Sequence, residues 1–461
     1  MEQKNLDFVK KYYSDPKIKE LILSQSQNYS YCVGTGVTLL EQGWTFPIKE
    51  VGISQIEELL NEGLDISFPI RCKDDNYLYI VWDIKYFNTE NPNWIFDRVN
   101  QKKIFELGSP IFEAVEETLD SFGIKYLVDI TVSGIHVWSK IKVSSEAFCK
   151  FASESNLFPS LEQKYTQIIP EDKKRTRPVS LDLGRAYNTA GKILEYFSHI
   201  LIDKSKEFKI PITVSGAASF SKNFSFSGIS SDLSQYSHPI YMRCMRAFCS
   251  LHQKSVMNGF SELGSAVNII KTKEISYVDS LEIMWNVDKA LNFYNKNFKK
   301  KKIDVPDSSQ GWLEAFNSYT KSELRKKHKI WERIPATKKD CDLTQPDVKK
   351  FFEPANANPA LLIPSNLQII VNHFASSGVS AVKKVFSIIA KYYADKMLGW
   401  YDYLKFTGIN WDKYDPETVS DFWGRIYWSL NIPSVPKNVQ NVPKSSKSQK
   451  KQKKQKRKNG K

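Results

Sequence analysis

The stretch DITVSGIHVWSKI, residues 129 to 141, places a short polar sequence, Ser133-Gly134-Ile135-His136, between two apolar runs. The apolar runs predict two buried strands on either side of a polar connection. Gly134 would let the backbone approach a ligand closely. The hydroxyl of Ser133 and the imidazole of His136 could hydrogen-bond a phosphate group, although a single histidine between strands is more often a structural residue.

The sequence around this stretch mixes strand and helix patterns. The apolar run YLYIVW, residues 77 to 82, predicts a strand that is covered on both faces and that ends at Asp83. Apolar residues at helical spacing predict helices over about 110–122, 188–202 and 278–298, the first of them with Pro110 in its first turn. Residues 1–302 are therefore expected to form an α+β domain.

The pattern changes after residue 302. The segment DVPDSSQ, residues 304–310, is typical of a linker, and residues 310–432 have mostly helical patterns rich in tryptophan and tyrosine. The expected organisation is an α+β domain over 1–302, an all-α C-terminal domain over 303–433 and a disordered basic tail over 434–461.

The composition limits the class of protein. The sequence of 461 residues has no stretch of about 18 consecutive apolar residues, so no membrane span is expected. The N-terminus lacks an apolar signal region, and the six cysteines form no CxxC pair. These features favour an intracellular protein, cytoplasmic or, in a eukaryote, nuclear.

Positive charge is concentrated at the C-terminus. The net charge is +15, and residues 444–461 contain ten Lys or Arg and no acid, so the rest of the chain carries +15 − 10, about +5. Such a tail binds polyanions with little sequence preference, or serves as a solubilising or localisation segment. Further basic runs at 299–302 and 321–329 favour contact with nucleic acid.

The segment IYMRCMRAFCSLHQKS, residues 240 to 255, alternates cationic and apolar residues and is called the basic segment below. Permanent charges on one face of a strand would pair well with an anion, whereas the simpler interpretation is a solvated surface strand. Asp83 has two interpretations as well, since a carboxylate at a strand end can hold a divalent cation or can cap a turn. The candidate nucleotide-binding residues of the segment are Arg243, Arg246, Ser250, His252 and Lys254.

Together, YIVWDIK (79–85), TVSGIHVW (131–138) and Asp232 followed by MRAFCSLHQKS (245–255) resemble the motifs of the archaeo-eukaryotic primase superfamily. That superfamily includes primase small subunits and plasmid or viral primase-polymerases. The resemblance covers about residues 40–260, and the basic segment is its most specific part. Residues 378–397 and 415–430 also resemble the helical bundles that follow the catalytic core in plasmid and viral primases.

The resemblance implies a core of two small facing sheets, related to the RNA-recognition fold, and template-dependent joining of nucleotides on single-stranded DNA. It implies Mg²⁺ or Mn²⁺ held by Asp83 and Asp232, in two-metal phosphoryl transfer. Nucleoside triphosphates and a single-stranded DNA template are the implied partners, with a replicative helicase or polymerase as a further candidate and no membrane. The residues implied to bind nucleotide are Ser133, His136, Arg243, Arg246, Ser250, His252 and Lys254.

The sequence departs from the family pattern at Lys85, where a second carboxylate is usual. Residues 83 and 85 lie on the same face of a strand, so a cation would point to the place where a metal is expected. Asp129 shares strand parity with Ser133 and could substitute. Asp182, in PVSLDLGR, is an alternative to Asp232 as the third acid.

Three hypotheses remain. The first is a primase or primase-polymerase, and the second is a non-catalytic, DNA-binding relative in which Lys85 spoils the metal site. The third, a rolling-circle nickase, requires two histidines spaced two apart on one strand, and none of the six histidines has that spacing.

Overall fold

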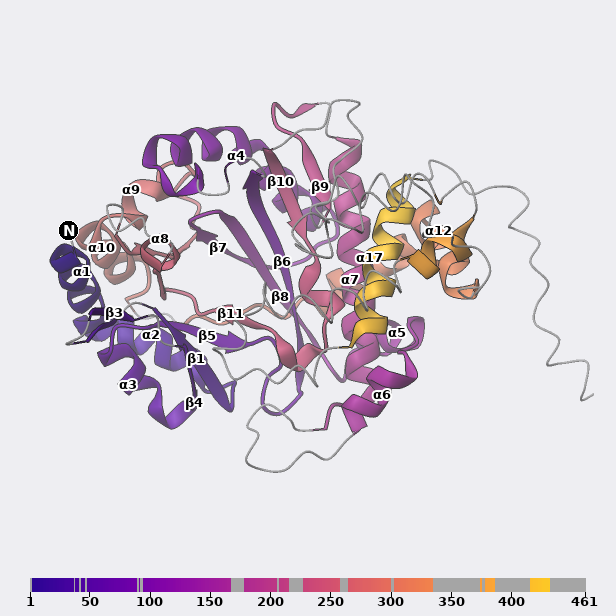
Figure 1. Ribbon diagram of the computed structural model, residues 1–461, viewed down its shortest axis with the longest axis horizontal. Coiled ribbons are helices and arrows are strands. Elements are labelled where there is room, and N and C mark those ends of the chain that lie inside the picture. The colour runs from indigo at the N-terminus through magenta and orange to yellow at the C-terminus, as the bar shows by residue number, and fades with distance from the viewer. Residues whose placement is uncertain are drawn as a thin grey trace, which may run out of the picture.

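The computed structural model (Figure 1) describes residues 2–36, 38–40, 43–45, 48–88, 91, 94–166, 178–204, 207–214, 227–257, 264–299, 302–334, 374, 378–385 and 415–431. Over these residues the chain is α+β, as the sequence predicts. No helix in the described ranges is long and apolar enough to cross a membrane. The predicted basic tail over 434–461 lies outside the described residues.

The central sheet has six strands in the order β14-β7-β8-β6-β10-β9. Only β9 and β10 run parallel to each other, and the other neighbours are antiparallel. Asp83 lies inside β6 rather than at its end, because the strand continues with alternating burial after the fully apolar run. The strands are β6 (Tyr77–Asn88), β7 (Leu127–Thr131), β8 (Gly134–Lys142), β9 (Ile212–Val214), β10 (Ser227–Asp232) and β14 (Ile269–Ile270).

A second sheet has the order β11-β5-β1-β4 and lies below the central sheet in the view of Figure 1. Its strands are β1 (Tyr31–Thr35), β4 (Ile48–Gly52), β5 (Asp65–Pro69) and β11 (Cys244–Arg246). Two further pairs are β2 (Thr38–Leu40) with β3 (Gly43–Thr45), and β12 (Leu251–His252) with β13 (Ala266–Val267). That the two sheets have the primase-type arrangement stays a prediction.

Two long helices pack on the central sheet, and both begin earlier than predicted. Helix α4 (Arg98–Ser121) begins after Asp97, whose side chain accepts a hydrogen bond from Asn100 N at 2.9 Å, so Pro110 lies inside the helix. The N-cap carboxylate, rather than the proline, sets the start. Helix α7 (Leu181–Asp203) contacts β6 and β9. The helix predicted over 278–298 is divided at Asn286 into α9 (Ser280–Met284) and α10 (Val287–Asn297).

The remaining helices of the first 302 residues surround the sheets. They are α1 (Glu2–Ser14), α2 (Pro16–Ser26), α3 (Ile56–Asn61), α5 (Glu146–Glu154), α6 (Pro159–Thr166) and α8 (Lys254–Met257). Single 3-10 turns occur at Ile53–Gln55, Trp94–Phe96, Ser234–Ser237 and Ile240–Met242. The helices α1 and α10 contact each other, so the start of the chain and the last helix before residue 302 close the same side of the fold.

The segment predicted as a linker pairs with β8. Lys140 N donates to Pro306 O at 3.1 Å, and Ser308 N donates to Lys140 O at 2.9 Å. Helix α11 (Ser309–Lys321) then packs on α5, followed by α12 (Glu323–Arg333) and α17 (Pro416–Asn431). The structure also describes a helical stretch over 379–385, and the rest of the predicted helical region lies outside the described residues. The division at residue 302 into two domains stays a prediction.

Candidate active site

Four polar residues lie side by side across four neighbouring strands. In the strand registers, Asp129 of β7 is opposite His136 of β8, His136 is opposite Asp83 of β6, and Asp83 is opposite Asp232 of β10. Residues directly opposite one another in a sheet project from the same face. These four residues, Asp129, His136, Asp83 and Asp232, are called the cross-strand row below.

His136 lies between two carboxylates of the row. Its Nε2 is 3.7 Å from Asp83 Oδ1, and its Nδ1 is 3.6 Å from Asp129 Oδ2. Asp129 is fully buried and accepts a hydrogen bond from Asn268 Nδ2 at 2.9 Å. Burial raises the pKa of Asp129, and His136 partly opposes this. Asp129 therefore lies on the far side of His136 from the pair formed by Asp83 and Asp232, and does not substitute for a carboxylate beside them.

Lys85 connects two carboxylates of the row, Asp83 and Asp232. Its Nζ is 3.3 Å from Asp83 Oδ2 and also forms an ion pair with Asp232 Oδ2. Burial lowers the pKa of Lys85, but Asp232 and Asp83 outweigh it, so the pKa lies above 10.5. Burial likewise raises the pKa of Asp232, and the Lys85 ammonium reverses this and holds it well below 3.8. The expected cation thus occupies the position between the two predicted metal ligands.

The basic segment brings further cations to this place. Arg246 lies in β11, and its Nη2 is 3.3 Å from Oδ2 of the buried Asp65. Burial raises the pKa of Asp65 to about 6, against the lowering effect of Arg246. Lys254 begins α8 and is exposed. Partial desolvation and then the nearby cations Lys85 and Arg246 lower the pKa of Lys254.

His252 completes the cluster from β12. Burial lowers the pKa of His252 well below 6.5, and Arg246, Lys254 and His136 lower it further. This imidazole is therefore neutral and lies near the charged groups of both sheets. The two sheets, the β12–β13 pair and α8 together bring six predicted site residues into one cluster, namely Asp83, His136, Asp232, Arg246, His252 and Lys254.

Several buried polar atoms of this cluster have no hydrogen-bond partner within the protein. They are Asp129 Oδ1, His136 Nδ1, Arg246 Nε, His252 Nδ1 and Asn268 Oδ1. Buried polar groups are nearly always satisfied in folded proteins, so a concentration of unsatisfied ones indicates a place where water or a ligand binds. The unsatisfied atoms come from both sheets, and they mark the same region as the charged groups.

Three other predicted residues have different surroundings. Ser250 is fully buried, and its Oγ accepts a hydrogen bond from Ile66 N at 2.7 Å, which fixes β5 and gives the serine a structural role. Arg243 lies close enough to His238 to lower its pKa further, after burial. Ser133 occupies the turn between β7 and β8, where its carbonyl accepts from Tyr86 N at 2.8 Å.

The glycine of the motif is required by strand packing. A Cβ at Gly134 would collide with the backbone carbonyl of Ile84 and with Cα of Lys85. Close approach of β8 to β6, rather than of a ligand, therefore explains this glycine. Asp182, the alternative third acid, lies in the first turn of α7, where it is exposed and paired with Arg185 at 3.4 Å.

The residues present do not fit a two-metal centre. No group of three or more His, Cys, Asp or Glu side chains in the described part of the chain could hold a metal ion. Within the described residues, Lys85 forms ion pairs with two carboxylates, Asp83 and Asp232. Its ammonium already balances part of their charge. A cation bound to both would have to replace Lys85.

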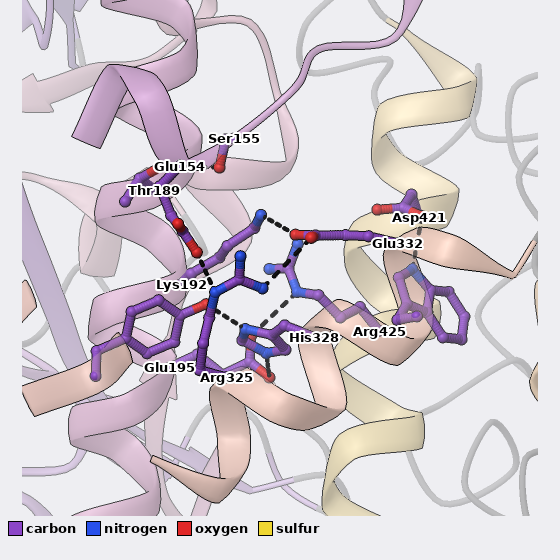
Figure 2. Close-up of polar contacts among 12 residues, drawn as sticks. Glu154, Ser155, Thr189, Lys192, Glu195, Arg325, His328, Glu332, Asp421 and Arg425 are labelled. Carbon is purple, nitrogen blue, oxygen red and sulfur yellow. Dashed lines mark hydrogen bonds and ion pairs between the residues drawn. The ribbon is translucent and has the colours of Figure 1, made fainter. Parts of the chain in front are cut away.

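A second polar cluster, which the sequence did not reveal, lies on α7 (Figure 2). Glu195 is fully buried; its Oε1 lies 3.1 Å from His328 Nε2 and accepts from Ser429 Oγ at 2.8 Å, and its Oε2 accepts from Arg425 Nε at 3.2 Å. Burial raises the pKa of Glu195, but His328 and Arg425 outweigh it, so the net pKa is well below 4.5. This carboxylate connects α7 to α12 and α17.

The same cluster turns part of the basic run over 321–329 inward. Arg325 is buried and forms ion pairs with Glu154 and, at 3.4 Å, with Glu332. Lys327 is buried as well and donates to Ser429 O at 2.7 Å. Glu332 also pairs with Lys192 of α7 at 2.6 Å (Figure 2). Arg325 and Lys327 therefore hold helices together, whereas the other cations of the run, Lys321, Lys326 and Lys329, are exposed. Contact of the run with nucleic acid stays a prediction.

The only sequence signal of this cluster is a pair of charged residues, Lys192 and Glu195, in the otherwise apolar GKILEYF of α7.

Comparison with known proteins adds no identification. No protein-family model matches the sequence, and no curated protein is significantly similar to it.

Proposed function

We propose that this protein is a primase-type nucleotidyltransferase that binds single-stranded DNA and nucleoside triphosphates and joins nucleotides on the template. The observation that carries the proposal is the convergence of the cross-strand row with Arg246, His252 and Lys254. These residues come from four separate segments of the sequence, 83, 129–136, 232 and 246–254, and meet at one place. Convergence of distant motifs is typical of a functional site.

In this proposal the cations of the basic segment bind the phosphates of the nucleotide. Arg246 and Lys254 supply permanent positive charge, and the neutral His252 supplies a hydrogen-bonding imidazole. Asp129 lies beside Nδ1 of His136 and Asp83 beside its Nε2, so Asp129 is a positioning residue that acts through the imidazole. The template would be held by the surplus of positive charge of the chain, most of which lies in residues 444–461.

A second candidate function is supported by one specific observation, the ion pairs of Lys85 with Asp83 and Asp232. If the ammonium of Lys85 prevents the reaction, the protein is a non-catalytic, DNA-binding replication subunit. Such a subunit would retain the fold and the binding of phosphates but would form no bond between nucleotides.

De novo primer synthesis on single-stranded DNA distinguishes the two functions. With labelled nucleotides and Mg²⁺ or Mn²⁺, we expect the wild type to form product and Asp83→Asn to lose at least about a hundredfold of the rate. Asp182→Asn is the matched control, because it makes the same change at the exposed alternative acid, and it should retain the rate. Absence of product from the wild type, with binding of DNA intact, would reject the enzyme and favour the non-catalytic subunit.

A further inference from the structure

Lys85 lies between the last two carboxylates of the row, Asp83 and Asp232, and its own side chain is 39 % exposed. Its ammonium contacts one carboxylate on its own strand and one on the neighbouring strand, and those two side chains are only 17 % and 15 % exposed. Asp232 is further fixed by a hydrogen bond from Ser234 N to its Oδ1 at 2.9 Å. The ammonium is thus an internal counter-ion for two carboxylates that lie next to each other.

The charge of this arrangement can be compared with that of a metal centre. A third carboxylate together with the divalent cation that it helps to hold carries one net positive charge. A single ammonium carries the same charge. Lys85 can therefore replace both without changing the total charge that a nucleotide would meet.

We propose that Lys85 takes the place of one carboxylate and one divalent cation, so that the protein alone binds no Mg²⁺ or Mn²⁺ and a nucleotide brings the only divalent cation to the site. The first half of this inference concerns the protein without nucleotide and stands on the ion pairs of Lys85. The second half rests on the proposed function, because it assumes that a nucleoside triphosphate binds.

Titration with Mn²⁺ alone, followed by the electron paramagnetic resonance signal of the free ion, tests the first half. We expect Lys85→Asp to bind Mn²⁺ and the wild type to show no binding over the same range of Mn²⁺ concentration. The affinity of Lys85→Asp for Mn²⁺ should therefore exceed that of the wild type at least about tenfold. Lys85→Met, which removes the ammonium but adds no carboxylate, should lie between the two. Lys209→Asp makes the same change of charge at an exposed lysine and should behave as the wild type. Far-ultraviolet circular dichroism of each variant confirms that it is folded.

The second half is tested by adding a non-hydrolysable ATP analogue and measuring the Mn²⁺ bound per nucleotide. One bound ion is expected for the wild type and two for Lys85→Asp. Binding of Mn²⁺ by the wild type without nucleotide, or of two ions with it, would overturn the inference. If no protein binds the analogue, the proposed function fails, and the titration with Mn²⁺ alone still decides the role of Lys85.

Discussion

Replacing Glu195 with alanine should lower the free energy of unfolding by about 3–5 kcal/mol, because it leaves buried charge without a partner. The carboxylate is fully buried, and the guanidinium of Arg425 beside it is 3 % exposed. Without Glu195, Arg425 keeps its charge in the interior and His328 loses the carboxylate that lies 3.1 Å from its Nε2. Denaturation with guanidinium chloride, followed by tryptophan fluorescence, measures the loss.

A matched control separates burial from the mere loss of a carboxylate. Glu282 also pairs with a cation, Lys289 at 2.6 Å, but its side chain is 76 % exposed. Exposed ion pairs contribute little, so Glu282→Ala should change stability by less than about 0.5 kcal/mol. Equal effects of Glu195→Ala and Glu282→Ala would show that the cluster in Figure 2 does not hold α12 and α17 on α7.

Acidification from about pH 6.5 to pH 4 should destabilise the protein strongly, because several buried histidines resist protonation. Burial lowers the pKa of His199 to about 4. The unfolded chain, with an ordinary histidine pKa near 6.5, takes up protons in this range that the folded chain does not, so unfolding becomes easier as the pH falls. For His199 alone the difference corresponds to about 3 kcal/mol. The other histidines whose pKa is lowered are His238, His252 and His328.

Asp65 has the opposite effect on stability. Burial raises its pKa to about 6, so as the pH falls the folded chain takes up this proton before the unfolded chain does. Carboxyls with a lowered pKa, such as Glu195, become destabilising only at lower pH. Chemical denaturation at a series of pH values should therefore give a stability that rises from pH 4 to pH 6.5. His199→Gln should flatten that rise by up to about 1.4 kcal/mol per pH unit. A stability that is level over this range would contradict the assignment of neutral buried histidines.

The sequence predicted local features of the site better than its long-range contacts. The common face of Asp83 and Lys85 follows from the two-residue period of a strand, and the structure confirms it. The strands around Ser133 also follow from apolar runs. In contrast, the pairing of Asp232 with Asp83 depends on the register of two strands far apart in the chain, which no local pattern determines.

The errors have physical causes of the same kind. Lys327 belongs to a basic run whose charge favours contact with nucleic acid, but this side chain is buried and donates to Ser429 O. Ser250 belongs to the most specific motif, yet its hydroxyl is used by the backbone of β5. Gly134 suggested room for a ligand, whereas its reason is the proximity of β6. In each case the partner lies on a distant segment.

The binding of a nucleoside triphosphate by Lys254→Ala is the most direct test of the proposed site. Lys254 is exposed, and partial desolvation followed by the cations Lys85 and Arg246 lowers its pKa, so removing it should leave stability unchanged or slightly increased. The affinity of the Lys254→Ala protein for a fluorescent ATP analogue, measured in the presence of single-stranded DNA, should nevertheless fall at least about tenfold. Lys209→Ala should bind as the wild type does. Equal affinity of Lys254→Ala and the wild type would contradict phosphate binding beside the cross-strand row.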